Sequence, residues 1–138
     1  MKKTKYSIAI LLPYKEIYST NFSGAASIWV KDYLRKSFLT KKTVVYGYLE
    51  EKLKPLTKNF KNISIVKTSF SKTKQYINYF YKDYLKNNFE VIEIHNRPEY
   101  LNFLIKKRTS SKLIFFFHNN PKEIRGSKTT KERLNILE

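Results

Sequence analysis

Both histidines of the chain directly follow apolar segments that have the composition of buried strands. His95 comes after the segment EVIEI, and His118 comes after the segment KLIFFF. Each is followed by amide side chains, Asn96 in the first case and Asn119 and Asn120 in the second. Imidazole and carboxamide groups both donate and accept hydrogen bonds, which suits the binding of a sugar hydroxyl or a phosphate. The sequence therefore predicts a polar binding site built from two loops.

Two arginines and one glycine extend this candidate site toward anions. Arg97 precedes a helix that starts with Pro98, and Arg125 lies in the loop after His118. Either arginine can bind phosphate, but Arg97 can also simply pair with a nearby glutamate. Gly24 stands where another helix begins, so it would let a ligand approach free backbone amides. A plain helix cap is the alternative explanation for this glycine.

His118 is the residue that we expect to carry catalysis. Pro121 restricts the residue before it, Asn120, to an extended conformation, which stiffens the loop that holds His118. We expect His118 to line a cleft with Gly24, and His95 to lie on the same edge of the sheet. In a complete enzyme that contains this chain, His118→Ala is expected to lower kcat/KM by at least ~10-fold and to leave folding stability little changed. The alternatives are a loop-capping role for His118 and a structural role for His95.

Apolar runs alternate with helical patterns along the chain. Five segments have the composition of strands: 6–12, 43–48, 63–67, 90–94 and 112–117. Four segments show helical spacing or helix-start signals: 23–38, 73–88, 98–107 and 130–137. The fifth strand is apolar on both faces, which is typical of a central parallel strand. Residues 52–61 are predicted to form a basic surface connector.

This alternation predicts an α/β fold, a Rossmann-like doubly wound parallel sheet with strand order 3-2-1-4-5. The length of 138 residues fits one domain, so residues 1–138 are taken as a single unit. In such sheets ligands bind outside the carboxyl ends of the strands, where the strand order reverses. The loops that contain the two histidines are expected at that edge.

Several function classes are excluded or disfavoured by what the sequence lacks. The chain has no cysteine, so thiolate chemistry and disulfides are excluded. Two histidines in separate loops form no recognisable metal site, and no cofactor is predicted. The glycine-rich dinucleotide fingerprint, the phosphate-binding P-loop and the nucleophile elbow are missing. The apolar runs are too short for a membrane span, and the amino-terminal run is too short for a signal peptide.

The charge is strongly positive, with 28 Lys and Arg residues against 11 Asp and Glu residues and a formal net charge of +17. Such a field attracts phosphates, nucleic acid or anionic lipid. Most of these basic residues are lysines, however, and the abundance of Asn, Ile, Tyr and Phe indicates the coding bias of an AT-rich genome. A basic binding module without catalysis, for nucleic acid or an anionic membrane, is therefore the alternative functional class. A nucleotide-dependent enzyme of another Rossmann-like type is a third.

Three segments together resemble a known enzyme family. EVIEIHNRPEY at 90–100, KLIFFFHNNP at 112–121 and SGAASIWVKDYL at 23–34 are similar to segments of retaining glycosyltransferases of the GT-B fold, family GT4. The similarity is greatest to the transferases of lipopolysaccharide core and O-antigen assembly. It implies that the chain is the N-terminal, acceptor-side half of a GT-B enzyme. The C-terminal donor domain of that family is absent from these 138 residues.

The resemblance also implies roles for individual residues and partners. Gly24 resembles the glycine near the donor diphosphate, and His118 resembles the histidine that faces the sugar in the interdomain cleft. The segment His95-Asn96-Arg97 resembles the loop beside the acceptor. The implied partners are a nucleotide-sugar donor and a glycan or lipid-linked glycan acceptor, with nucleic acid not expected. A cytoplasmic protein that associates with the inner face of the plasma membrane, and that is inactive without its donor domain, would follow.

Overall fold

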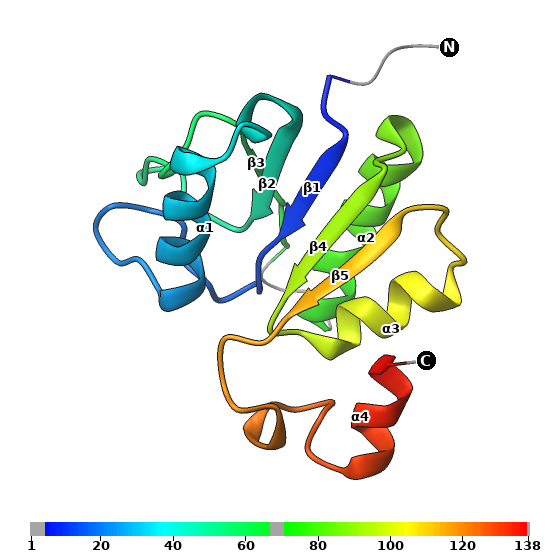
Figure 1. Cartoon of the computed structure of the whole chain (residues 1–138). Helices are drawn as coiled ribbons and strands as arrows, with labels where there is room; N and C mark the ends of the chain where they lie inside the picture. Colours follow the sequence, from blue (N-terminus) through cyan, green and yellow to red (C-terminus); the bar gives the residue numbers. More distant parts are fainter. Residues whose placement is uncertain (1–4, 67–70, 138) are drawn as a thin grey trace.

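The computed structural model describes residues 5–66 and 71–137 as an α/β fold around one parallel sheet. The five strands are β1 (Ile8–Leu11), β2 (Thr43–Gly47), β3 (Phe60–Asn62), β4 (Val91–His95) and β5 (Lys112–Phe116). They pair in the order β3-β2-β1-β4-β5, and every pair is parallel (Figure 1). The predicted Rossmann-like sheet and its strand order are thus confirmed.

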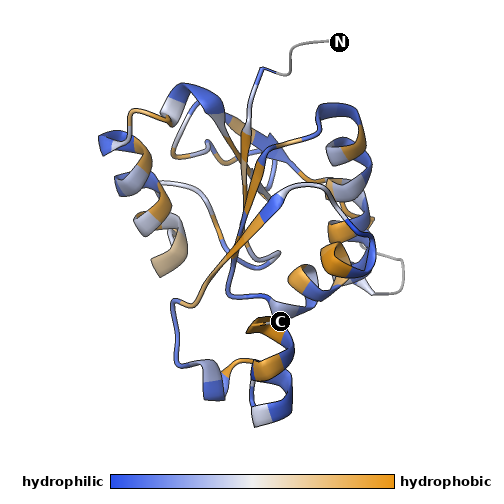
Figure 2. Cartoon of the chain, turned by 45° about the vertical axis from the view of Figure 1, so that its right-hand side comes forward, coloured by the Kyte–Doolittle hydropathy of each residue, from blue (hydrophilic) through white to orange (hydrophobic). Residues whose placement is uncertain are grey.

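Helices cover both faces of the sheet. The α-helices are α1 (Ala25–Lys36), α2 (Lys72–Asn87), α3 (Pro98–Lys106) and α4 (Thr130–Leu137). Two short 3-10 helices cover Thr40–Lys42 and Pro121–Glu123. Figure 2 shows α1 on one side of the sheet and α2 with α3 on the other, with apolar segments turned toward the strands between them. Within the described residues, no helix is both long and apolar enough to cross a membrane.

Each face of the sheet has its own hydrophobic core. The larger core lies between the sheet and α2 and α3, and its fully buried aromatic side chains include Tyr76, Phe80 and Tyr100. The smaller core lies under α1, where Ala26, Val30 and Leu34 pack against β1 and β2. The alternation of side chains along a strand sends successive residues to opposite cores. His95, at the end of β4, therefore lies on the α1 face, as its ring contact with Trp29 of α1 confirms.

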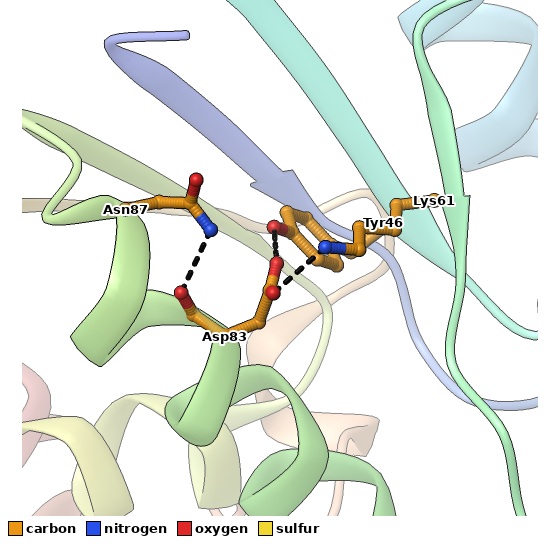
Figure 3. A network of polar contacts seen from close by, with 4 residues as sticks. All are labelled: Tyr46, Lys61, Asp83 and Asn87. Carbon is orange, nitrogen blue, oxygen red and sulfur yellow. Dashed lines mark hydrogen bonds and ion pairs between the residues drawn. The ribbon is translucent and has the colours of Figure 1, made fainter. Parts of the chain in front are cut away.

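A partly buried polar network connects α2 to the β2–β3 side of the sheet (Figure 3). The Tyr46 hydroxyl donates a hydrogen bond to the Asp83 carboxylate, and Lys61 Nζ lies 2.7 Å from Asp83 Oδ1. Asn87 closes the network by donating to the Asp83 carbonyl oxygen at 2.8 Å. Burial, followed by the Asp83 carboxylate, raises the pKa of Tyr46 well above its usual value of 10.0, so this hydroxyl remains a donor.

The helix boundaries of α2 follow the signals in its sequence. Ser71 accepts a hydrogen bond from the Lys74 amide, as a cap at the start of a helix does. Asn88 ends the helix in the left-handed conformation, with φ at 50°, and donates from its backbone to Tyr84.

Two predictions about strands were wrong. The third strand covers Phe60–Asn62 and not 63–67, of which residue 67 lies outside the described residues. Ile63 follows this strand and is fully buried, so its apolar character shifted the predicted boundary. β5 is an edge strand with half-buried side chains, and not a central one.

Candidate functional site

The two histidines meet at the carboxyl edge of the sheet. His95 ends β4 and His118 lies two residues beyond β5, and these strands are neighbours. His95 Nδ1 lies 2.6 Å from His118 Nε2, which is hydrogen-bonding distance, and the two rings stack with centroids 4.9 Å apart. Residues 23 positions apart in sequence are thus brought into direct contact, on the edge where parallel sheets bind ligands.

The aromatic side chains of Trp29 and Phe116 surround the pair. The Trp29 ring on α1 lies 5.6 Å from the His95 ring and 5.7 Å from the His118 ring, centroid to centroid. Phe116 stacks on His95 at 4.9 Å. His95 is completely buried, whereas His118 is only partly buried. His118 is therefore the member of the pair that solvent or a ligand can reach.

The pair carries a hydrogen-bonding deficit. Among the described residues, His95 Nε2 has no hydrogen-bond partner. The carboxylate oxygen Glu93 Oε2 lies 3.9 Å away and likewise has none. Burial, with a further contribution from His95, lowers the pKa of His118 below its usual value of 6.5, and the Glu16 carboxylate opposes this shift. A neutral His118 has one ring nitrogen engaged with His95 and the other, Nδ1, turned away from it. That second nitrogen can exchange a hydrogen bond with a hydroxyl group.

Asn96 fixes the position of His118. Its Oδ1 atom accepts a hydrogen bond from the His118 backbone amide at 2.7 Å, and its own backbone amide donates to Phe116 at 2.9 Å. Asn96 adopts a left-handed backbone conformation with φ at 53°, which asparagine tolerates better than most residues. The two loops are therefore joined through the Asn96 side chain, which acts as a positioning group here.

The predicted arginines line a second feature, a polar cavity of about 310 Å³ beside the histidine loops. Arg97 and Arg125 lie on its wall with Lys15, Tyr100 and other residues. Arg97 also donates to the Asn96 carbonyl oxygen at 2.9 Å, and the fully exposed Arg125 pairs with Glu99 at 3.7 Å. Both arginines thus have local partners and an open cavity in front of them.

Gly24 is the cap residue at the start of α1. The group that approaches its backbone closely is the Glu16 side chain and not a ligand. A β-carbon at Gly24 would lie 2.2 Å from Glu16 Oε1. That carboxylate oxygen accepts a hydrogen bond from the Ser27 amide in the first turn of α1, at 2.9 Å. Glu16 therefore occupies the place at the helix amino terminus where an anion would bind.

The two remaining predicted residues lie outside these contacts. Asn119 is exposed, and Asn120 uses its side chain to accept a hydrogen bond from the Lys122 amide at 3.1 Å. Asn120 thus caps the short helix that follows. Of the described residues, no three His, Cys, Asp or Glu side chains form a group that could hold a metal ion.

Sequence reasoning missed Trp29 and Glu16. Trp29 is the only tryptophan of the chain and lies within the predicted helix, one position before the buried stripe residue Val30. A single tryptophan in the second turn of a helix capped by glycine could have marked Trp29 as a candidate site residue. Glu16 is an acidic residue within the loop after β1, and nothing in its spacing indicates that it reaches α1.

The chain matches no protein-family model, no curated protein and no solved structure. Its function must therefore be argued from the site itself.

Proposed function

We propose that this chain is the N-terminal, acceptor-side domain of a GT-B-type retaining glycosyltransferase. When completed by a donor domain, it would transfer a sugar from a nucleotide-sugar to a lipopolysaccharide or other surface-glycan acceptor. The observation that carries the proposal is the contact between His95 and His118 at the carboxyl edge of β4 and β5. It supports the similarity of these two segments to the histidine loops of that family.

The chemistry of the pair suits sugar transfer. Sugar transfer needs groups that hold a hydroxyl in place and cations where phosphate charge develops. His118, whose lowered pKa favours the neutral form, offers a hydrogen bond and no competing charge. Arg97 and Arg125 lie in the adjoining cavity and supply positive charge. The donor-binding groups would come from the second domain, so we expect the 138-residue chain alone to show no transfer.

The test is a comparison of variants in the enzyme completed by its donor domain. His118→Ala is expected to lower kcat/KM by at least ~10-fold, which is about 1.4 kcal/mol of transition-state stabilisation. Lys122→Ala, an exposed change in the same loop, serves as the matched control and should leave kcat/KM unchanged. A fully active His118→Ala enzyme would refute the assignment, as would sugar transfer by the isolated chain.

We also propose that the protein works at the cytoplasmic face of the plasma membrane as a peripheral protein. The support is its formal net charge of +17. Basic side chains near an anionic membrane surface contribute about 1 kcal/mol each. Sedimentation with vesicles that contain anionic lipid should show association at low salt that is lost at high salt. If no association is found at low salt, the positive charge reflects coding bias and not membrane binding.

A further inference from the structure

Two cavities share part of their wall in the loop after β1. Tyr14 and Lys15 line the polar cavity of about 310 Å³ and also a second cavity of about 600 Å³. The backbone amide of Tyr14 donates to the Tyr100 hydroxyl at 3.1 Å, and the Tyr14 ring lies 5.3 Å from the Tyr48 ring. Tyr14 thus lines both cavities and contacts one further lining residue of each, Tyr100 in the first and Tyr48 in the second.

The first cavity is basic. Among the described residues, three cationic side chains line it, Lys15, Arg97 and Arg125, against the single carboxylate of Glu99. The first turns of two helices also border it, through Thr73 of α2 and Glu99 of α3. Helix amino termini carry partial positive charge, which adds to that of the side chains. This half of the site therefore favours an anion.

A hydroxyl donor completes the basic half. Burial raises the pKa of Tyr100 to about 12, so its hydroxyl stays protonated at neutral pH. Because that oxygen accepts a hydrogen bond from the Tyr14 amide, its own hydrogen is available to an acceptor. Phosphate oxygens are strong acceptors and bind arginine side chains well.

The second cavity is mainly apolar. Its wall consists of aliphatic and aromatic side chains with a few charged ones at the edge: Ile17, Phe22, Tyr48, Leu49, Leu53, Glu50 and Lys72. Phe22 is 69% exposed and Ile17 is 36% exposed, so apolar surface is open at the mouth. The loop after β1 and the loop after β2 are held together by a bridge between Ser19 and Pro55. The two loops that supply most of this cavity's lining are therefore linked to each other.

We propose that the two cavities form one binding site for a phosphorylated amphiphile with a hydrocarbon chain, of the lipid-phosphate class. The phosphate would lie among Lys15, Arg97 and Arg125, and the first part of the hydrocarbon would pass Tyr14 into the apolar cavity. Joined to the proposed transferase function, on which this reading of the ligand rests, the site would hold the lipid-phosphate end of a lipid-linked glycan acceptor. A nucleotide fits less well, because the aliphatic wall offers little to the hydrogen-bonding edge of a base.

Binding to the 138-residue chain tests the site directly, since no donor domain is required. Farnesyl phosphate, used below its micelle concentration, is the probe, and inorganic phosphate, farnesol and uridine monophosphate are the comparison ligands. Amide chemical shifts in a two-dimensional NMR titration report both affinity and place. We expect farnesyl phosphate to bind more tightly than each comparison ligand and to shift residues of both cavities, including Tyr14, Phe22 and Arg97.

Two exposed variants divide the site into its halves. Phe22→Ser should weaken farnesyl phosphate binding by about fivefold and leave inorganic phosphate binding unchanged, because it removes apolar contact only. Arg125→Gln should weaken binding of both ligands by about threefold, the size expected of an exposed ion pair. The matched controls are Phe38→Ser and Arg35→Gln, which alter exposed residues outside both cavities and should have no effect.

Four outcomes overturn the proposal: no binding of farnesyl phosphate, equal binding of inorganic phosphate, equal binding of uridine monophosphate, or shifts confined to residues outside the cavities. Equal binding of inorganic phosphate would leave a simple anion site, and equal binding of the nucleotide would leave a nucleotide site. Transfer by the completed enzyme to a water-soluble acceptor, without farnesyl phosphate binding, would refute this inference and leave the proposed function standing. Binding of farnesyl phosphate, without any sugar transfer by the completed enzyme, would refute the proposed function and leave this inference standing.

Discussion

Replacing His118 by alanine removes the hydrogen-bond partner of a completely buried ring nitrogen. His95 is 0% exposed, and its Nδ1 atom lies 2.6 Å from its hydrogen-bond partner His118 Nε2. Its Nε2 atom has no hydrogen-bond partner in the described part of the chain. A buried polar group left unsatisfied costs about 1–3 kcal/mol. We therefore expect His118→Ala to lower the free energy of unfolding by about 1–3 kcal/mol. The sequence alone predicted little change, because it does not show that His118 serves a buried neighbour.

Urea unfolding followed by tryptophan emission measures this change. Trp29 is the only tryptophan, and it contacts both imidazole rings, so the signal reports on this region. His118→Gln is the matched variant, because its carboxamide can donate or accept in place of the imidazole, and it should recover part of the loss. Neutral surface substitutions change the free energy of unfolding by up to about 0.5 kcal/mol. If His118→Ala stays within that range of the wild type, the buried His95 ring does not depend on its hydrogen bond with His118.

Three further predictions concern pH and two other contacts. The folded-state pKa of His118 lies below 6.5, so the unfolded chain takes up a proton first as the pH falls. The stabilisation that the neutral His118 provides is therefore complete above pH 6.5 and declines below it. The urea midpoint of the wild type should fall over that pH range by more than the midpoint of His118→Gln, which has no imidazole at this position. Asp83→Ala should lower the free energy of unfolding, measured by heat or urea, by about 2 kcal/mol, because the buried Tyr46 hydroxyl loses its hydrogen-bond acceptor. The loss should be smaller in a Tyr46→Phe background. Gly24→Ala should cost about 0.5–2 kcal/mol by displacing Glu16 from α1, and a double-mutant cycle should show no cost once Glu16→Ala has removed that cap.

The fold was predictable because strand and helix patterns alternate cleanly and parallel sheets allow few topologies. Helix ends were less predictable. The predicted helix over 23–38 extends beyond α1, which ends at Lys36, and Phe38, four residues after the buried Leu34, is 93% exposed. Each step of four residues advances about 40° around a helix with 3.6 residues per turn. A stripe followed only at four-residue steps therefore rotates off the buried face. Leu85 and Ile105, near the ends of α2 and α3, are exposed as well.

The candidate site was predictable to the level of the loops and not of the contacts. Parallel strands end at one edge, so the loops with His95 and His118 had to approach each other. Hydrogen-bonding distance between the two rings also depends on the left-handed turn at Asn96, which the sequence does not specify. The role of Gly24 could not be foreseen either, because the group that approaches it, Glu16, comes from a loop with no regular pattern.

Burying the histidine pair is energetically unfavourable, which argues that the pair has a role beyond packing. Within residues 5–66 and 71–137, the buried His95 Nε2 atom has no hydrogen-bond partner, and neither has the nearby Glu93 Oε2 atom. Its ring lies flat against Phe116 and beside Trp29, so the surroundings are those of an aromatic core residue. An apolar ring in such a place avoids the desolvation of polar atoms, and replacing buried polar groups by apolar ones is often neutral or stabilising. Positions where a sequence departs from the most stable choice are expected at functional sites. The departure here falls on the edge of the sheet where the fold would place a ligand, and it involves the one partly accessible imidazole, that of His118.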